Sequence, residues 1–284
     1  MTSPKALLRA WNLRPQKKLG QHFLVDPSTA NMIARHSRIS SADTVIEIGA
    51  GLGALTVPVA RIARRVYAVE KDSKLIQLLK PELLVHQLTN VEIIEKNILD
   101  VDLQMLAEKS DLPLVVIGNL PYNISSQVLV KLIEARCNVN RAILMFQKEL
   151  ARRITASPGN KDYGRLTVML SYCAEIKSIA TVKASLFYPA PKIDSEVVEI
   201  NFDVRRQYPP HDEKMLYQVI KAAFGNRRKT LRNALASSGL QIEPWKAKQA
   251  LIAAGIDPSR RAETLDVSEF VALQISLVQA LKAR

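Results

Sequence analysis

A glycine-rich turn is the first place in the chain where chemistry is expected. The run Val45–Ile48 is apolar except for Glu47, and glycine then occupies positions 49, 51 and 53. Without a Cβ atom, a glycine lets the chain turn tightly and lets a ligand lie against the backbone. A helix that starts after the turn presents unpaired N–H groups to a carboxylate or phosphate. The pattern predicts a nucleotide-type ligand here, with a plain strand-to-helix corner as the alternative.

Two acidic side chains indicate which ligand this is. Glu70 ends the next predicted strand, about where a carboxylate accepts both hydroxyls of a ribose. Together with Gly49 and Gly51, that position also fits a dinucleotide such as NAD. A negative charge at Glu47, however, gains nothing beside a pyrophosphate, whereas it stabilises an ammonium or sulfonium group. The sequence therefore favours S-adenosylmethionine as the cofactor.

Two further polar residues are candidates for the same site. Asn97 follows the third predicted strand, where its side chain can pair with the adenine amino edge of the cofactor or simply cap the turn at 99–103. Both interpretations stay open. His22, next to Gly20 and Gln21, is the histidine that we expect near the cofactor.

A second candidate site follows the fourth predicted strand, where the chain reads Asn119-Leu120-Pro121-Tyr122. In a parallel sheet this loop lies beside the glycine turn, because the carboxyl ends of the strands share one edge. If Asn119 Oδ1 and the carbonyl of Leu120 or Pro121 accept the two N–H bonds of an adenine amine, its lone pair faces an activated methyl group. Pro121 stiffens the loop, and Tyr122 offers a ring on which the base can stack.

This loop predicts methyl transfer to an adenine amine, with a turn that only ends a strand as the alternative. The leaving group is neutral and the proton goes to solvent, so no acid, base or metal ion is required. Phe187, in the Pro-rich segment 187–195, is assigned to the opposite face of the base and Lys192 to a phosphate. Packing of Phe187 beneath its own loop is the other possibility.

The chain must supply a scaffold for these loops. Apolar, β-branched runs at 44–48, 66–69, 91–94, 114–117 and 142–146 alternate with helical patterns, which indicates a parallel sheet covered by helices. Runs at 177–182 and 197–202 complete seven strands. We predict an α/β, Rossmann-like, class I methyltransferase domain in 27–208, after a basic arm in 1–26. Helical patterns then predict a small all-α domain in 209–284, and its basic clusters indicate that it binds RNA.

The charge of the chain indicates its partner. The 284 residues carry a formal net charge of +13 and 48% hydrophobic residues, typical of a folded protein that binds a polyanion. Cys137 and Cys173 show no metal-ligand spacing, and we expect no metal, no membrane span, a cytoplasmic location and a monomer. The residues expected to contact RNA are Lys17, Lys18, Arg152, Arg153, Lys192, Arg227, Arg228 and Lys229.

Taken together, these motifs resemble the ribosomal RNA adenine dimethyltransferase family of the small-subunit, KsgA type. The resemblance covers essentially the whole chain and includes the segments 19–24, 47–53, 119–122, 147–149, 187–195, 224–232 and 261–265. It implies dimethylation at N6 of two adjacent adenosines in the 3′-terminal hairpin of 16S rRNA, within an assembling 30S subunit.

The resemblance also implies which residues contact the cofactor, namely His22, Leu24, Gly49, Glu70, Asn97 and Asn119. The chain departs from the family pattern at Asn97, where Asp is usual, and at His22, where many relatives carry Asn. The first change keeps an oxygen acceptor but loses a charge, which bears on cofactor affinity.

Two other functions remain open at this point. One is a large-subunit rRNA methyltransferase of the macrolide-resistance type, which shares the catalytic motifs but differs in its C-terminal helices. The other is a non-catalytic RNA-binding assembly factor on the same scaffold. The presence of Glu47, Glu70 and the loop 119–122 argues against lost catalysis.

Overall fold

The structure is a computed structural model that describes residues 3–204, 208–209, 211–226 and 228–282. The chain divides into two compact units. The sheet unit comprises Met1–Ala151 and Glu175–Asp203, and the helical unit comprises Arg152–Ala174 and Val204–Arg284.

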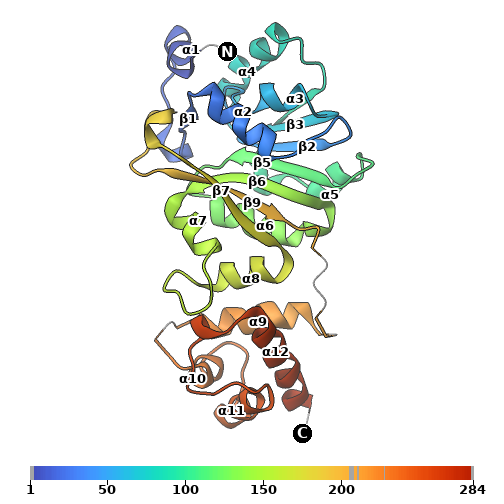
Figure 1. Cartoon of the computed structure of the whole chain (residues 1–284), viewed down its shortest axis with the longest axis vertical. Coiled ribbons are helices and arrows are strands. Elements are labelled where there is room, and N and C mark those ends of the chain that lie inside the picture. The colour runs from blue at the N-terminus through green and yellow to red at the C-terminus, as the bar shows by residue number, and fades with distance from the viewer. Residues whose placement is uncertain (1–2, 205–207, 210, 227, 283–284) are drawn as a thin grey trace. The chain divides into compact units, whose positions relative to one another are not determined.

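A seven-stranded sheet forms the centre of the sheet unit, in the order β4-β3-β2-β5-β6-β9-β7 (Figure 1). The five strands from β4 to β6 are parallel, whereas β9 runs antiparallel to both β6 and β7. This arrangement confirms the predicted α/β class and its seven strands. The strands are β2 (Thr44–Ile48), β3 (Arg65–Glu70), β4 (Val91–Glu95), β5 (Leu114–Asn119), β6 (Val139–Gln147), β7 (Glu175–Val182) and β9 (Ser195–Asn201).

The sheet reverses its direction of winding between β2 and β5. From β2 the chain continues outward to β3 and β4, and from β5 it continues the other way to β6. The register pairs Ile48 with Val69 on one side and with Gly118 on the other, so neighbouring strands end level. Such a switch point leaves a crevice outside the carboxyl ends of the strands, where ligands bind in this class of fold.

Helices and apolar packing hold the sheet in place. One core cluster joins α2 and α3 to the sheet through residues such as Ile33, Val59 and Ile117. Asp26 accepts a hydrogen bond from Thr29 N and so caps α2, as its place before Pro27 predicts. The helices of the unit are α1 (Pro4–Ala10), α2 (Pro27–His36), α3 (Thr56–Ala60), α4 (Ser73–Val85), α5 (Leu103–Ala107) and α6 (Ser125–Glu134), and α7 (Lys148–Ile154) begins in it.

The N-terminal segment packs onto the sheet unit. Leu8 is buried together with Phe23, Leu52, Leu75 and Leu78. The short strand β1 (Phe23–Leu24) pairs with β8 (Phe187–Tyr188) in a second, two-stranded sheet. The segment 1–26, expected as a separate basic arm, is therefore part of the sheet unit, because its apolar residues are buried there.

The helical unit has its own hydrophobic core, formed by residues such as Leu216, Leu235, Leu251 and Phe270. Its chain division differs from the expected boundary at 208/209, since residues 152–174 belong to it and the second crossing lies at 203/204. The physical reason is burial: Tyr163 and Val168 lie in this core. The helices are α8 (Arg165–Cys173), α9 (Glu213–Ala223), α10 (Leu231–Ala236), α11 (Pro244–Ala253) and α12 (Val267–Lys282).

A glycine lets β2 and β5 approach at the switch point. A Cβ atom added to Gly118 would lie 2.7 Å from the backbone oxygen of Ile48 and 3.2 Å from its Cβ atom. Such distances are too short for ordinary contacts, so a side chain here must push the two strands apart. We expect Gly118→Ala to lower the free energy of unfolding by at least about 1–3 kcal/mol, the cost of overpacking.

Urea unfolding measures this effect, with Gly239→Ala as the matched control. A Cβ atom added to Gly239 has no neighbour within 4 Å among the described residues. The control should stay within about 0.5 kcal/mol of the wild type. Equal stabilities for the two variants would show that the strands do not need the glycine.

Candidate functional site

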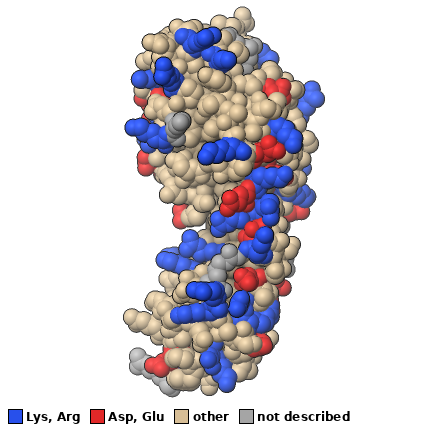
Figure 2. All heavy atoms as spheres, turned by 90° about the vertical axis from the view of Figure 1, so that its left-hand side faces the viewer, with Lys and Arg blue, Asp and Glu red and all other residues tan. Residues whose placement is uncertain are grey.

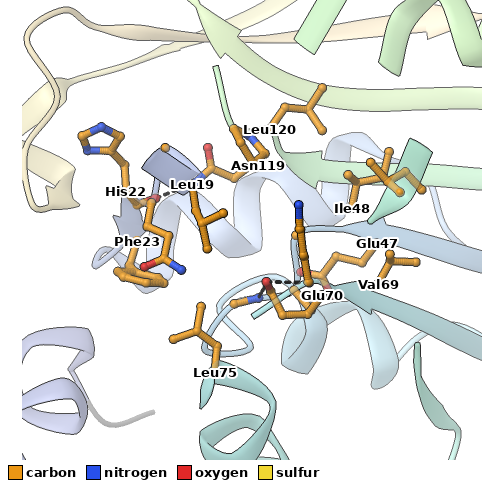
Figure 3. Close-up of a pocket in the computed structure, with 18 of the residues that line it drawn as sticks. Leu19, His22, Phe23, Glu47, Ile48, Val69, Glu70, Leu75, Asn119 and Leu120 are labelled. Atoms are coloured by element: carbon orange, nitrogen blue, oxygen red, sulfur yellow. Dashed lines mark hydrogen bonds between the residues drawn. The ribbon is translucent and has the colours of Figure 1, made fainter. Parts of the chain in front are cut away.

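A cleft opens at the carboxyl ends of β2, β3, β4 and β5, where the sequence places its candidate residues (Figure 3). Its lining residues include the segments 19–24, 47–52, 69–71, 96–98 and 119–124. The cofactor and loop residues brought together here are His22, Leu24, Glu47, Gly49, Gly51, Glu70, Asn97, Asn119, Leu120, Pro121 and Tyr122. Segments far apart in the chain thus form one surface.

The glycine turn takes the backbone shape that its sequence predicts. Gly49, Gly51 and Gly53 all have positive φ angles, of 75°, 54° and 86°. Side chains other than glycine rarely adopt this region, so each glycine is required for the course of the chain. The Gly51 N–H donates to Glu70 Oε2 at 2.9 Å, which ties the turn to the end of β3 (Figure 3).

Glu70 is held by backbone donors on both of its oxygens. Its Oε1 atom accepts hydrogen bonds from Lys71 N and Asp72 N, each at 2.8 Å. Burial raises the pKa of the Glu70 carboxyl, and these backbone hydrogen bonds oppose the rise. The carboxylate is thus fixed in direction. Oε1 already accepts two hydrogen bonds, whereas Oε2 accepts one and keeps a lone pair for a ribose hydroxyl.

Glu47 is a buried carboxyl with one unpartnered oxygen. Its side chain lines the cleft at 1% exposure, and Oε2 has no hydrogen-bond partner among the described residues. Burial raises the pKa of Glu47 to about 8; Thr56 opposes the rise, and the charge of Glu70 adds to it. A buried acid with one unpartnered oxygen favours a cationic ligand beside it. The residues therefore fit the ammonium and sulfonium groups of S-adenosylmethionine.

Asn119 has a fixed side-chain orientation. Its Nδ2 atom donates to the backbone carbonyl of His22 at 2.8 Å. Because a carbonyl only accepts, the amide nitrogen must face it. Oδ1 is then left to accept a hydrogen bond from another group. This orientation agrees with the predicted role of Asn119 Oδ1 as an acceptor for an amine.

The two backbone carbonyls after Asn119 differ in their hydrogen bonding. Pro121 O already accepts from Ser125 Oγ at 3.0 Å and from Ile124 N at 3.2 Å. No such donor to Leu120 O occurs among the described residues. The sequence left open which carbonyl receives the second N–H bond, and the structure favours Leu120.

Tyr122 and His22 form an aromatic wall. Their rings stack with centroids 5.5 Å apart and an interplanar angle of 26°. Tyr122 Oη lies 3.1 Å from Ser195 Oγ, and His22 Nδ1 lies 2.7 Å from Pro189 O, to which it donates. The loop 187–195 thus holds this wall by hydrogen bonds.

Phe187 does not reach the cleft. Its side chain is only 4% exposed and packs in the core with residues that include Leu24 and Val197. The expectation that it stacks on the target base is therefore corrected to the alternative, packing beneath the loop. The reason is the pairing of β8 with β1, in which Phe187 lies opposite Leu24.

Asn97 shows one of the two interpretations that the sequence left open. Its Oδ1 atom accepts from Leu99 N at 3.2 Å and so caps the 3-10 helix Ile98–Asp100. The same residue lines the cleft. The capping function is present, and pairing with an adenine remains a prediction.

Comparison with known proteins identifies the chain. The family model described as Ribosomal RNA adenine dimethylase matches residues 12–278.

The chain belongs to the ribosomal RNA adenine dimethylase family.

Curated relatives span nearly the whole chain and carry one name. A Ribosomal RNA small subunit methyltransferase A from Desulforapulum autotrophicum is 50% identical over 98% of this chain and 97% of its own. Proteins of that name from Magnetococcus marinus and Geobacillus kaustophilus are 43% and 39% identical, over 95% and 96% of this chain and 94% of each of theirs. The predicted resemblance is confirmed.

Two solved structures share the fold. A dimethyladenosine transferase from Plasmodium falciparum aligns with a TM-score of 0.76 at 26% identity, over 91% of this chain and 98% of its own. The 23S rRNA methyltransferase ErmE aligns with a TM-score of 0.66, also at 26% identity, over 90% of this chain and 100% of its own. The similarity supports the expected methyltransferase architecture.

In this member of the dimethylase family, basic charge is concentrated in the helical unit. Residues 152–174 and 204–284 contain 18 Lys and Arg against 8 Asp and Glu, a net +10 out of +13 for the chain. Basic side chains predominate over acidic ones on the face of this unit that Figure 2 presents.

The expected RNA contacts are distributed over both units. In the sheet unit, Lys18 and Lys192 are exposed. In the helical unit, Arg152, Arg153, Arg228 and Lys229 are all exposed, and Arg152 also pairs with Asp162 at 2.9 Å. The Lys17 side chain and Arg227 lie outside the described residues.

Sequence reasoning missed some residues of the cleft. Pro4, Leu75 and Ile98 line it although they carry no chemical signal of their own. Within the described residues, no group of three His, Cys, Asp or Glu side chains is arranged to hold a metal ion. No helix in the described part of the chain is long and apolar enough to cross a membrane.

The raised pKa of Glu47 predicts how stability depends on pH. A carboxyl whose pKa rises from 4.5 in the unfolded chain to about 8 in the folded one holds its proton more tightly when folded. Its contribution to stability is therefore full at low pH and is lost as the pH rises through 8. We expect the free energy of unfolding of Glu47→Gln, relative to wild type, to increase by a few kcal/mol between about pH 5 and 8.

Urea unfolding of both proteins without cofactor across this pH range measures the difference. Since the histidines and other titrating groups are common to the two proteins, their contributions cancel. Parallel stability curves would contradict the raised pKa.

Proposed function

We propose that the chain transfers methyl groups from S-adenosylmethionine to N6 of two adjacent adenosines in the 3′-terminal hairpin of 16S rRNA, within the pre-30S particle in the cytoplasm. Family membership supports methylation of adenine in rRNA. The name of the three curated relatives supports the small subunit as substrate. The oriented amide of Asn119, beside a cleft fit for a cationic cofactor, is the observation that carries the chemistry.

The cofactor end of the cleft is built for recognition by charge and shape. Glu70 Oε2 is positioned to accept a ribose hydroxyl, and Glu47 to face the cationic amino-acid portion. When bound, S-adenosylmethionine supplies a sulfonium-linked methyl group whose departure leaves a neutral thioether. Gly49 and Gly51 have no side chain, so a ligand can lie against the backbone of the turn.

The acceptor end aligns the amine. Asn119 Oδ1 accepts one N–H of adenine N6, and Leu120 O accepts the other. With both hydrogens directed to oxygens, the nitrogen lone pair is left to point at the methyl carbon. Tyr122 supports the base by stacking, as base-modifying enzymes commonly do with an extruded nucleotide. The amine releases its proton to solvent after the transfer.

The helical unit supplies affinity for RNA. Its net charge of +10 matches a phosphate backbone, and such attraction acts without reading sequence. The protein is proposed to act as a monomer on a structured RNA, whose shape places the target adenosines.

A large-subunit activity is the second candidate, because ErmE shares the fold along 90% of this chain. Methylation of purified small-subunit and large-subunit precursors, followed by mass-spectrometric mapping of the modified nucleotides, separates the two. We expect two adjacent dimethylated adenosines in the small-subunit rRNA. Modification of the large-subunit rRNA alone would overturn the small-subunit proposal and support an ErmE-like activity instead.

Removal of the Asn119 amide tests the catalytic geometry. We expect Asn119→Ala to lower kcat by about 100-fold or more, comparable with the loss of one transition-state hydrogen-bonding group elsewhere. Cofactor affinity, measured by calorimetry, should change little. Asn31→Ala, an exposed position on α2, is the matched control and should keep full activity. Unchanged turnover in Asn119→Ala would remove this residue from the mechanism.

Charge reversal in the helical unit tests RNA binding. Arg228 and Lys229 are both exposed. We expect the double change Arg228→Glu and Lys229→Glu to weaken RNA binding and to reduce the slope of log K against log salt by about 2, one for each lost phosphate contact. Lys80→Glu, on an exposed position of α4, is the single-site control and should leave the slope near that of wild type. An unaltered slope in the double variant would place these two residues outside the interface.

A further inference from the structure

Asp72 is a buried carboxylate that joins three segments of the cleft. It caps α4 by accepting from Lys74 N through Oδ1 at 3.1 Å. Its Oδ2 atom accepts from Gln16 Nε2 at 2.9 Å and from Gln21 Nε2 at 2.8 Å. Its own N–H donates to Glu70. The side chain therefore fixes two glutamines from the N-terminal segment beside the carboxylate assigned to the ribose.

The two glutamines also bind each other. Gln16 N donates to Gln21 Oε1 at 2.7 Å, and Leu19 N donates to Gln16 O at 3.0 Å. Segment 16–21 is thus a closed loop whose two side-chain amides converge on a single oxygen. Hydrogen bonds to a charged, partly buried acceptor are among the stronger ones in proteins.

The residue after this loop orients the catalytic amide. His22 O is the acceptor that holds Asn119 Nδ2. A Cβ atom added to Gly20 would lie 3.5 Å from Pro121 Cβ and 3.5 Å from Tyr122 N, so the loop also packs on the acceptor segment. One short stretch of chain therefore connects the ribose end of the cleft to its methyl-acceptor end.

We propose that Asp72, Gln16 and Gln21 form a clamp. The clamp fixes segment 16–22, and this segment positions Asn119 for catalysis through His22 O. These three are positioning residues, because they act through His22 and Glu70 rather than on the substrate. The proposal rests on the proposed function for the identity of the reaction. It adds that cofactor binding and amine alignment depend on one shared support.

Exchange of donor and acceptor across the clamp tests it. Gln21→Glu alone sets two carboxylates against each other. Asp72→Asn alone replaces one oxygen with an NH₂ group, so that either the helix cap or the glutamine amides lose their acceptor. In the double variant the new amide at position 72 can donate one N–H to the new carboxylate at position 21, while Gln16 N keeps its acceptor. The Gln16 side-chain amide, which in the wild type donates to position 72, must turn over so that its Oε1 accepts the second N–H. The clamp is then restored with its polarity reversed.

We expect each single variant to raise the cofactor Kd and to lower kcat, each by about tenfold, the loss of one charge-assisted hydrogen bond. The double variant should recover to within about threefold of wild type. Amide hydrogen exchange of residues 16–22 should accelerate in the single variants and slow again in the double variant. Melting temperatures should stay within about 4 °C, since Asn caps helices as well as Asp does.

Gln77→Glu is the matched control, because it adds the same charge at an exposed position on α4. It should change neither Kd nor kcat. Changes in a pair that only stabilises the fold would lower the melting temperature, whereas changes in a positioning pair alter Kd and kcat at a nearly constant one. Failure of the double variant to recover would overturn the clamp. The clamp would also be overturned if the single variants showed an unchanged cofactor Kd and unchanged amide hydrogen exchange of residues 16–22.

Failure of the proposed function gives a different result. If wild type transfers no methyl group to rRNA, the proposed activity is wrong, yet calorimetry with S-adenosylmethionine still tests the clamp. If wild type does not bind this cofactor either, amide exchange decides whether Asp72 holds the segment.

Discussion

The close approach of β2 and β5 at the switch point is the constraint on which the site depends. Gly118 brings the strands together, so the turn that begins at Gly49 and the loop that begins at Asn119 leave the sheet side by side. A Cβ atom on Gly49 would lie 3.7 Å from Asn119 O. In the proposed reaction, a methyl donor on one loop and an acceptor on the other must be held at near-contact distance for an in-line transfer. The sheet supplies that distance before any ligand binds.

Charge is separated within this basic chain. The cleft contains the acids Glu47 and Glu70, whereas most of the excess positive charge lies in the helical unit. Acids in the cleft repel phosphate and attract a cationic cofactor, and basic surfaces elsewhere attract the RNA backbone. The proposed cofactor and the proposed RNA are therefore attracted to different parts of the chain.

The N-terminal segment contributes more than its basic composition indicates. It buries Leu8 and Phe23, pairs β1 with β8 and directs two glutamine amides to Asp72. Each of these contacts lies beside the cleft, so the segment completes a site whose chemical groups come from the sheet. In this segment, a change of Gln16 or Gln21 should thus affect the cleft, whereas a change of a surface charge should not.

The sequence by itself determined the seven strands, the glycine turn, the Asn-Leu-Pro-Tyr loop and the family, because these depend on local patterns and on the shared edge of parallel strands. Tertiary structure alone decided that Phe187 is buried, that residues 152–174 belong to the helical unit, and that Gln16 and Gln21 bind Asp72. It also decided the raised pKa of Glu47, a consequence of burial. These outcomes depend on which surfaces pack together. Gln16 and Gln21 precede Asp72 by 56 and 51 positions, and no local pattern encodes a contact at that separation.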